Sequence, residues 1–130
     1  MKEYYLNNRI FYKKNEFKKD KKTLIFIHGL SGSSSAWIQY GGKFEKHYNV
    51  LSFDLRGHGK SFKFKNYEDY SFKKFADDLY SIIKKENINN FVLICHSFAV
   101  FIGLEFLKKH QKLINSVVFM PESAEQWDGW

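Results

Sequence analysis

The chain has 130 residues and a formal net charge of +7, with 44% hydrophobic and 19% aromatic residues. This length suits a single domain, and the apolar fraction is large enough for a core. The charge comes mainly from scattered lysines, because Arg9 and Arg56 are the only arginines. Without an arginine-rich stripe or a nucleic-acid motif, the composition favours a lysine-coated surface over nucleic-acid binding.

Further classes are excluded by cysteine use and by the distribution of apolar residues. The single cysteine, Cys95, excludes an intrachain disulfide and a cysteine-cluster metal site, and we expect no metal and no cofactor. The first residues lack the apolar segment of a signal peptide. No apolar run approaches the length of a membrane span. We therefore expect a cytoplasmic protein with no membrane span.

The first 22 residues are predicted to form a hairpin and a charged connector. Residues Tyr4–Tyr12 have strand-like composition, interrupted by the turn-forming pair Asn7-Asn8. Two continuous apolar strands follow, at Thr23–Ile27 and Asn49–Phe53, as expected for a parallel sheet that is buried on both faces. Between them we predict a helix from residue 36 to about residue 47, short or kinked because it contains two adjacent glycines.

The second half of the chain alternates in the same way. Ser71 is positioned to cap an amphipathic helix whose apolar residues recur at helical spacing, at Phe72, Phe75, Ala76, Leu79, Ile82 and Ile83. Asp77 and Asp78 are placed off this apolar face. A buried strand at Phe91–Cys95, a buried helix over residues 100–107 and a last strand at Ile114–Met120 complete the order.

Strands that alternate with helices predict an α/β fold with a mostly parallel, doubly wound sheet. Chemistry in such sheets lies at the carboxyl ends of the strands. Turns rich in glycine or serine follow three of the predicted strands, after Ile27, Phe53 and Ile94. All three turns are therefore expected at one edge of the sheet.

The turn after Ile94 leaves no room for a loop, because strand and helix are joined by Cys95-His96-Ser97-Phe98-Ala99. Such a sharp bend turns its middle residue, Ser97, outward, and it needs small residues two positions away on each side. Cys95 and Ala99 are small. The stretch is a degenerate form of the G-x-S-x-G nucleophile elbow. The alternative is an ordinary serine in a turn between a buried strand and a buried helix.

Two further motifs stand at the same edge. His28-Gly29-Leu30 follows the Thr23–Ile27 strand, and the residues from Asp54 to Ser61 match the pattern D-x-R-G-x-G-x-S completely. With the serine elbow, these motifs occur in the order found in the α/β-hydrolase family. Residues 23 to 121 resemble the N-terminal half of this family, and the fold appears here truncated after about the sixth strand.

The resemblance implies roles for individual residues. Ser97 maps to the nucleophile, and the backbone N–H groups of Leu30 and Phe98 map to the oxyanion hole. Pocket-lining positions are implied for His28, Gly29 and His96. His28 is expected to be structural, and His96 is not expected to take the proton of its neighbour Ser97, since adjacent side chains at this turn point apart.

The Asp54–Ser61 motif is implied to shape the loop beside the site. Asp54 and Arg56 are expected to form a structural ion pair, and His58 is expected to be a loop residue. Phosphate-binding alternatives fail on spacing. A P-loop ending at Gly59-Lys60-Ser61 would need a glycine where Asp54 stands, and a dinucleotide fingerprint would need one where Phe62 stands.

A serine triad needs an acid and a histidine after the serine. The one histidine after Ser97 is His110, about 20 Å away at the far end of the predicted helix. Glu122 follows the last strand, where some family members carry the acid, and residues 122–130 form an atypical tail. We therefore expect a single, partial domain over residues 1–130.

Two functions follow from this reading. The first is a serine hydrolase that acts on an ester, thioester or amide bond of a small acyl substrate, incomplete as given. The second is a catalytically inactive fragment or a binding module that keeps the hydrolase core. An open sheet edge beside Ile114–Met120 would allow self-association or pairing with a complementing chain.

Overall fold

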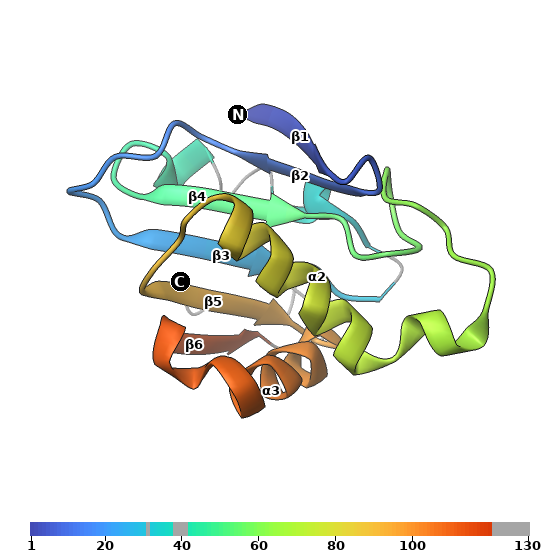
Figure 1. The fold of residues 1–130 in the computed structure, drawn as a ribbon. Coiled ribbons are helices and arrows are strands. Elements are labelled where there is room, and N and C mark those ends of the chain that lie inside the picture. Colours follow the sequence, from blue (N-terminus) through green and yellow to red (C-terminus); the bar gives the residue numbers. More distant parts are fainter. Residues whose placement is uncertain (31, 38–41, 121–130) are drawn as a thin grey trace.

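The computed structural model describes residues 1–30, 32–37 and 42–120. They form one six-stranded sheet with the order β1-β2-β4-β3-β5-β6 (Figure 1). The strands are β1 (Lys2–Leu6), β2 (Ile10–Lys14), β3 (Thr23–Ile27), β4 (Asn49–Phe53), β5 (Phe91–His96) and β6 (Ile114–Met120). Strands β3 to β6 run parallel, and β1 and β2 form an antiparallel hairpin at one edge. The predicted fold class is confirmed.

The hairpin turns at the predicted pair of asparagines. Asn7 and Asn8 both adopt positive φ angles, of 50° and 60°. Two adjacent left-handed residues give a turn whose twist matches that of the flanking strands, and asparagine tolerates this conformation better than most residues. The strands extend further from the turn than predicted, to Lys2 and Lys14.

Strand β3 pairs with β4 on one side and with β5 on the other. Because it is flanked by strands on both sides, it is buried along its whole length. The crossovers bring the three glycine- and serine-bearing turns to one edge of the sheet. The bounds of β3, β4 and β6 are those predicted from the sequence.

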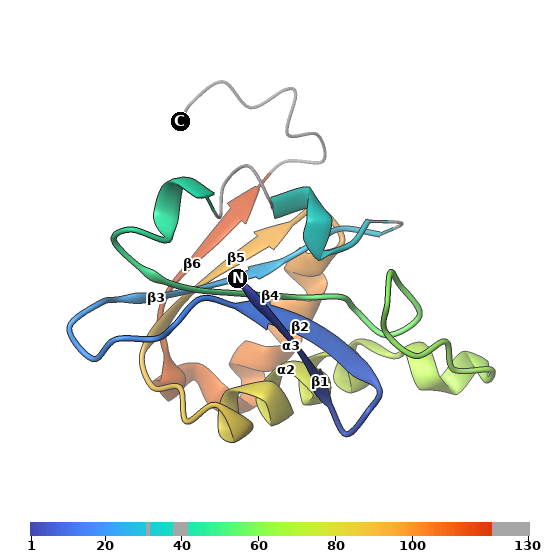
Figure 2. The ribbon, with the colours of Figure 1, turned by 90° about the horizontal axis from the view of Figure 1, so that it is seen from above.

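Two helices, α2 (Phe72–Lys85) and α3 (Ala99–His110), cover the same face of the sheet (Figure 2). The Ser71 hydroxyl accepts a hydrogen bond from the backbone N–H of Lys74 at 3.2 Å, which confirms the predicted cap of α2. The apolar face of α2 joins β-strand residues in the larger hydrophobic core. Short 3₁₀ helices stand at η1 (Ser34–Trp37), η2 (Tyr67–Tyr70) and η3 (Gln111–Leu113).

The sequence predicts that helix α3 is buried, but one side of this helix is exposed. Phe101 and Leu104 are exposed, while Ile102 and Phe106 face the core. Phe101 instead stacks on Phe72 of α2, with 5.4 Å between the ring centroids. A uniformly apolar helix gives no periodicity from which to identify its outer face, so the sequence could not separate the two sets.

The predicted helix from residue 36 to about residue 47 falls partly outside the described residues. Its described parts are η1 and a helical turn at residues 42–44. Residues 121–130, which include the predicted tail, also lie outside them. No helix in the described part of the chain has the length and apolar character needed to cross a membrane. The cytoplasmic location stays a prediction.

Candidate active site

Ser97 stands on the bend between β5 and α3, in a conformation that few non-glycine residues adopt. Its φ angle is +51°, which costs an L-residue roughly 1–2 kcal/mol. The surrounding chain holds it there: the Ser97 N–H donates to the Met120 carbonyl at 3.2 Å, and the Ser97 carbonyl accepts from Val100 N–H at 2.9 Å. Such strain persists only where neighbouring structure enforces it, and it is often found at active sites.

The bend is tight because helix and strand approach each other closely. Cys95 and Ala99 are fully buried on either side of Ser97. A Cβ atom at Gly103 would lie 2.9 Å from the Cys95 sulfur, so only glycine allows this approach. Burial raises the pKa of the Cys95 thiol to about 12. Cys95 is therefore a packing residue and not a nucleophile.

The turn after β3 contacts the elbow directly. A Cβ atom at Gly29 would lie 2.9 Å from Nδ1 of His96 and 3.3 Å from the His96 carbonyl oxygen. Leu30 follows this contact and is exposed. The backbone N–H groups of Leu30 and Phe98 donate to no acceptor among the described residues. These two donors thus stand on adjacent turns, Leu30 directly after Gly29 and Phe98 two residues after His96.

His28 joins the turn after β3 to the turn after β4. Its Nε2 accepts a hydrogen bond from Leu55 N–H at 2.9 Å, and its Nδ1 lies 2.7 Å from the Gly29 carbonyl oxygen. Both bonds form only if Nδ1 carries the proton and Nε2 does not. Burial lowers the His28 pKa to about 4, against an opposing effect of the Gly29 carbonyl. His28 is therefore a neutral, structural residue, whose two ring nitrogens are already occupied.

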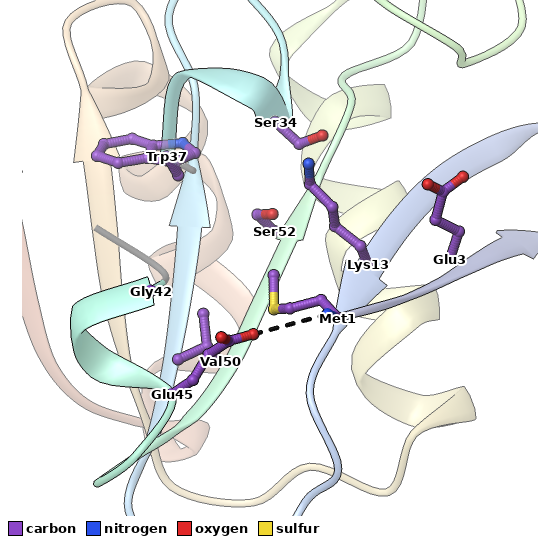
Figure 3. A pocket seen from close by; sticks show the side chains of 9 residues that line it. All are labelled: Met1, Glu3, Lys13, Ser34, Trp37, Gly42, Glu45, Val50 and Ser52. Atoms are coloured by element: carbon purple, nitrogen blue, oxygen red, sulfur yellow. Dashed lines mark ion pairs between the residues drawn. The ribbon is translucent and has the colours of Figure 1, made fainter. Parts of the chain in front are cut away.

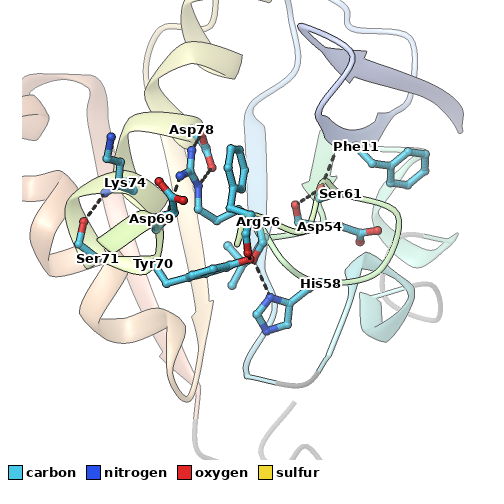
Figure 4. A network of polar contacts seen from close by, with 12 residues as sticks. Phe11, Asp54, Arg56, His58, Ser61, Asp69, Tyr70, Ser71, Lys74 and Asp78 are labelled. Carbon is cyan, nitrogen blue, oxygen red and sulfur yellow. Dashed lines mark hydrogen bonds and ion pairs between the residues drawn. The ribbon is translucent and has the colours of Figure 1, made fainter. Parts of the chain in front are cut away.

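Asp54 organises the turn after β4 through its carboxylate. The carboxylate accepts from Ser34 N–H at 2.6 Å and from Lys60 N–H at 2.8 Å (the turn is shown in Figure 4). Gly59 has a φ angle of +49°, and a Cβ there would collide with the Asp54 carboxylate. The Ser61 hydroxyl donates to the Asp54 carbonyl at 2.5 Å. The motif residues thus hold one another and η1 in place.

The predicted ion pair between Asp54 and Arg56 is wrong. Arg56 pairs with Asp78 of α2 through two hydrogen bonds, from Nε to Oδ2 at 2.8 Å and from Nη2 to Oδ1 at 2.9 Å (Figure 4). Its guanidinium also lies 4.3 Å from the centroid of the Phe64 ring. Burial raises the pKa of Asp78, and the Arg56 guanidinium opposes this shift. The pair connects the motif loop to α2 and not to the serine elbow.

Asp78 is the residue that sequence reasoning placed incorrectly. It is buried, although it was assigned to the outer face of its helix. The signal was present, because Asp78 follows Phe75 by three residues and precedes Ile82 by four, and both spacings put residues on the same helix face. A charged residue on an apolar face indicates a buried partner.

His96, His58 and His110 are not positioned as a general base for the Ser97 hydroxyl. His96 is half-buried, and its ring meets Trp37 edge-on, with 6.1 Å between the centroids. His58 lies 3.0 Å from the Arg56 carbonyl through Nδ1, and 5.2 Å from the His28 ring. His110 stacks on Tyr80. None of these described histidines hydrogen-bonds to the Ser97 hydroxyl. Glu122 lies outside the described residues.

Comparison with known proteins agrees with this geometry. The family model of the alpha/beta hydrolase fold matches residues 22–129. A Haemophilus influenzae protein that carries an esterase/lipase name is 29% identical over 107 residues, which are 82% of this chain and 36% of that protein. A solved marine microorganism esterase superposes with a TM-score of 0.75 at 27% identity, covering 85% of this chain and 41% of its own.

The fold alone is supported by a more distant structure. An alpha/beta hydrolase enzyme from a Medee basin deep-sea metagenome library superposes with a TM-score of 0.81 at 19% identity, over 91% of this chain and 43% of its own. The chain thus spans well under half the length of these relatives. The fold, the three motifs and the family match coincide on the same residues, and the chain belongs to the alpha/beta hydrolase family.

Proposed function

We propose that this chain carries the nucleophile half of a serine hydrolase, which cleaves an acyl substrate through an acyl-Ser97 intermediate. The observation that carries the proposal is the left-handed conformation of Ser97 between a buried strand and a helix start. This conformation is unfavourable for a serine, and such unfavourable conformations are found mainly at functional sites. The bend lies at the carboxyl end of β5, and α/β enzymes bind their ligands at this edge of the sheet.

In this proposal the Ser97 oxygen gives its proton to a base, attacks the substrate carbonyl carbon and forms a tetrahedral intermediate. The intermediate collapses to acyl-Ser97 as the alcohol, thiol or amine leaves with that proton, and water then hydrolyses the acyl-enzyme. The negative charge that develops on the carbonyl oxygen is stabilised by the N–H groups of Leu30 and Phe98. Neither donates to an acceptor in residues 1–30, 32–37 and 42–120, and Gly29 lets the two turns approach closely. The amino end of α3 adds a favourable dipole at the same place. The implied pocket-lining role is kept for Gly29 and His96 and not for His28, which is fully buried with both ring nitrogens hydrogen-bonded.

The general base of this reaction is not among the described histidines. A serine hydroxyl needs a base, and no described histidine reaches it. The base and the acid would come from residues outside those described, with Glu122 as a candidate acid. The second candidate is an inactive remnant or binding module, favoured by the same lack of a base among the described residues. Esters are the favoured substrate class, because two of the relatives carry esterase names.

The oxyanion geometry can be tested without a base, by replacing Ser97 with cysteine. A thiol is partly ionised near neutral pH and attacks activated esters unaided. We expect the Ser97→Cys thiol to be acylated by p-nitrophenyl acetate about 100-fold faster than N-acetylcysteine of matched ionisation, since one oxyanion donor contributes roughly 10²–10³ in rate. The measurement is intact-mass and peptide mapping over time.

Cys95 is the internal control of this experiment, since it neighbours position 97 but is buried with a raised pKa. The adduct should map to position 97 and not to Cys95. A rate at position 97 no higher than that of the free thiol would remove the oxyanion hole from the proposal, whatever the fold.

We also propose that the free edge of β6 pairs with another strand. β6 is the last strand of the described sheet, and its seven residues carry no charge and no proline. Natural edge strands often contain charged residues or proline, which prevent pairing with another strand. Sedimentation velocity at increasing concentration should show species above the monomer mass. A single monomeric species at protein concentrations up to about 100 µM would count against this edge contact.

A further inference from the structure

A cavity lies on the face of the sheet opposite α2 and α3, away from the helix-covered core (Figure 3). Its volume is about 350 Å³, and it is lined by residues of the β1–β2 hairpin, strand β4 and η1, together with Met1, Gly42 and Glu45. A cavity of this size is at the lower end of those that bind small molecules. Nothing in the proposed hydrolase chemistry uses it.

The floor of the cavity holds a polar group without a partner. Ser52 of β4 is 1% exposed, and its hydroxyl makes no hydrogen bond within the described part of the chain. An unpaired buried hydroxyl is unfavourable, and alanine or valine would fill the same strand position at lower cost. Figure 3 shows Ser52 among the side chains that line the cavity, below Ser34 and Lys13.

The charges around the cavity leave one cation unpaired. The Met1 ammonium group lies 3.8 Å from Glu45, and Glu3 pairs with Lys60 at 3.3 Å. Lys13 is half-buried and forms no ion pair with any described residue. Lys13 and Ser34 both line the cavity (Figure 3). The lining itself carries two cations, the Met1 ammonium group and Lys13, and two carboxylates, Glu3 and Glu45. Glu3 is the cross-strand neighbour of Lys13 but pairs with Lys60, which adds a third cation beside the cavity, and this excess of one positive charge favours an anion.

The remaining wall is apolar and rigid. The Trp37 ring is 5% exposed, and it packs on Phe26 of β3, with 4.9 Å between the centroids. Val50 lies two residues before Ser52 and therefore on the same face of β4. An aromatic and aliphatic wall beside a few placed polar groups is the usual composition of a ligand pocket.

We propose that this cavity binds a small amphipathic carboxylate. The carboxylate is held by the Lys13 ammonium group, with the hydroxyls of Ser34 and Ser52 as further donors, and the apolar body lies against Trp37 and Val50. The site does not depend on Ser97, so it stands or falls separately from the proposed hydrolase function. It would add a ligand-binding function on the face of the sheet opposite α2 and α3.

The test is titration calorimetry of the 130-residue chain with octanoate and with 3-phenylpropionate, and octan-1-ol serves as the neutral probe. We expect saturable binding of at least one carboxylate at a single site and weaker binding of the alcohol. Lys13→Met should weaken carboxylate binding at least tenfold, since a charge-assisted hydrogen bond is lost, and should leave alcohol binding unchanged. Ser52→Ala should weaken carboxylate binding about threefold.

Lys65→Gln is the matched control, because it removes one exposed lysine remote from the cavity. Ser52→Ala removes no hydrogen bond and is expected to fold, which circular dichroism and thermal unfolding would check. The proposal is overturned if neither carboxylate binds at millimolar concentration, if octan-1-ol binds as tightly as octanoate, or if Lys65→Gln weakens binding as much as Lys13→Met does. In the first case the cavity holds water alone.

Discussion

The 130-residue chain should hydrolyse a p-nitrophenyl ester slowly or not at all, despite its family. A serine hydroxyl is a weak nucleophile without an adjacent base, and none of the described histidines hydrogen-bonds to the Ser97 hydroxyl. In serine proteases, an enzyme without its triad still accelerates the reaction roughly 10³–10⁴-fold over the rate in water, through the oxyanion hole and substrate binding. The expected activity is thus about 10⁶-fold below that of a complete triad enzyme.

The assay compares the chain with its Ser97→Ala variant at matched concentration, both checked for folding by circular dichroism. The two should differ little, since the missing base already removes most of the contribution of Ser97. A robust turnover that the substitution abolishes would contradict this expectation and reveal a base. His58 would be the first residue to examine, because both ring nitrogens of His28 are already engaged.

Loss of the Asp78 carboxylate should be the most destabilising change among the polar contacts. Asp78→Ala would leave the Arg56 guanidinium buried without its bidentate partner, and breaking a buried pair in this way costs about 3–5 kcal/mol. Native domains have only about 5–15 kcal/mol of stability in total. Urea unfolding should show a midpoint far below that of the unchanged chain, or no folded baseline.

The neighbouring aspartate provides a matched control for this experiment. Asp77 pairs with Lys73 at 2.9 Å on the exposed face of the same helix. Such an exposed pair contributes about 0.3–0.5 kcal/mol, so Asp77→Ala should be nearly neutral. A double variant, Arg56→Met with Asp78→Leu, should recover much of the loss, since no charge is left buried. Equal effects of Asp77→Ala and Asp78→Ala would show that the pair has no special role.

The strands and their order along the chain could be predicted because buried parallel strands appear in the sequence as continuous apolar runs. Thr23–Ile27 and Asn49–Phe53 begin and end in the structure where these runs do. The bend at Ser97 was also visible, since no loop residues separate strand from helix. The left-handed φ angle follows from that lack of space, and small neighbours at Cys95 and Ala99 permit it.

Long-range polar partners could not be predicted in the same way. Arg56 has acidic residues nearby in sequence, and its partner Asp78 was not chosen because it lies 22 positions away on another element. The role of His28 as a bridge to the Leu55 N–H likewise depends on two turns meeting in space. The unpaired hydroxyl of Ser52 has no sequence signal, because buried serines in strands are ordinarily satisfied.

The most direct test of the account is to supply the missing base in solution. Imidazole, added in increasing concentration, should accelerate ester hydrolysis by the chain more steeply than by Ser97→Ala, since a small base can enter the site and accept the serine proton. Both proteins share the background reaction of imidazole with the ester, so the difference in slope reports Ser97 alone. The account predicts a clear difference between the two slopes. Equal slopes for two folded proteins would show that Ser97 is not a nucleophile in this chain.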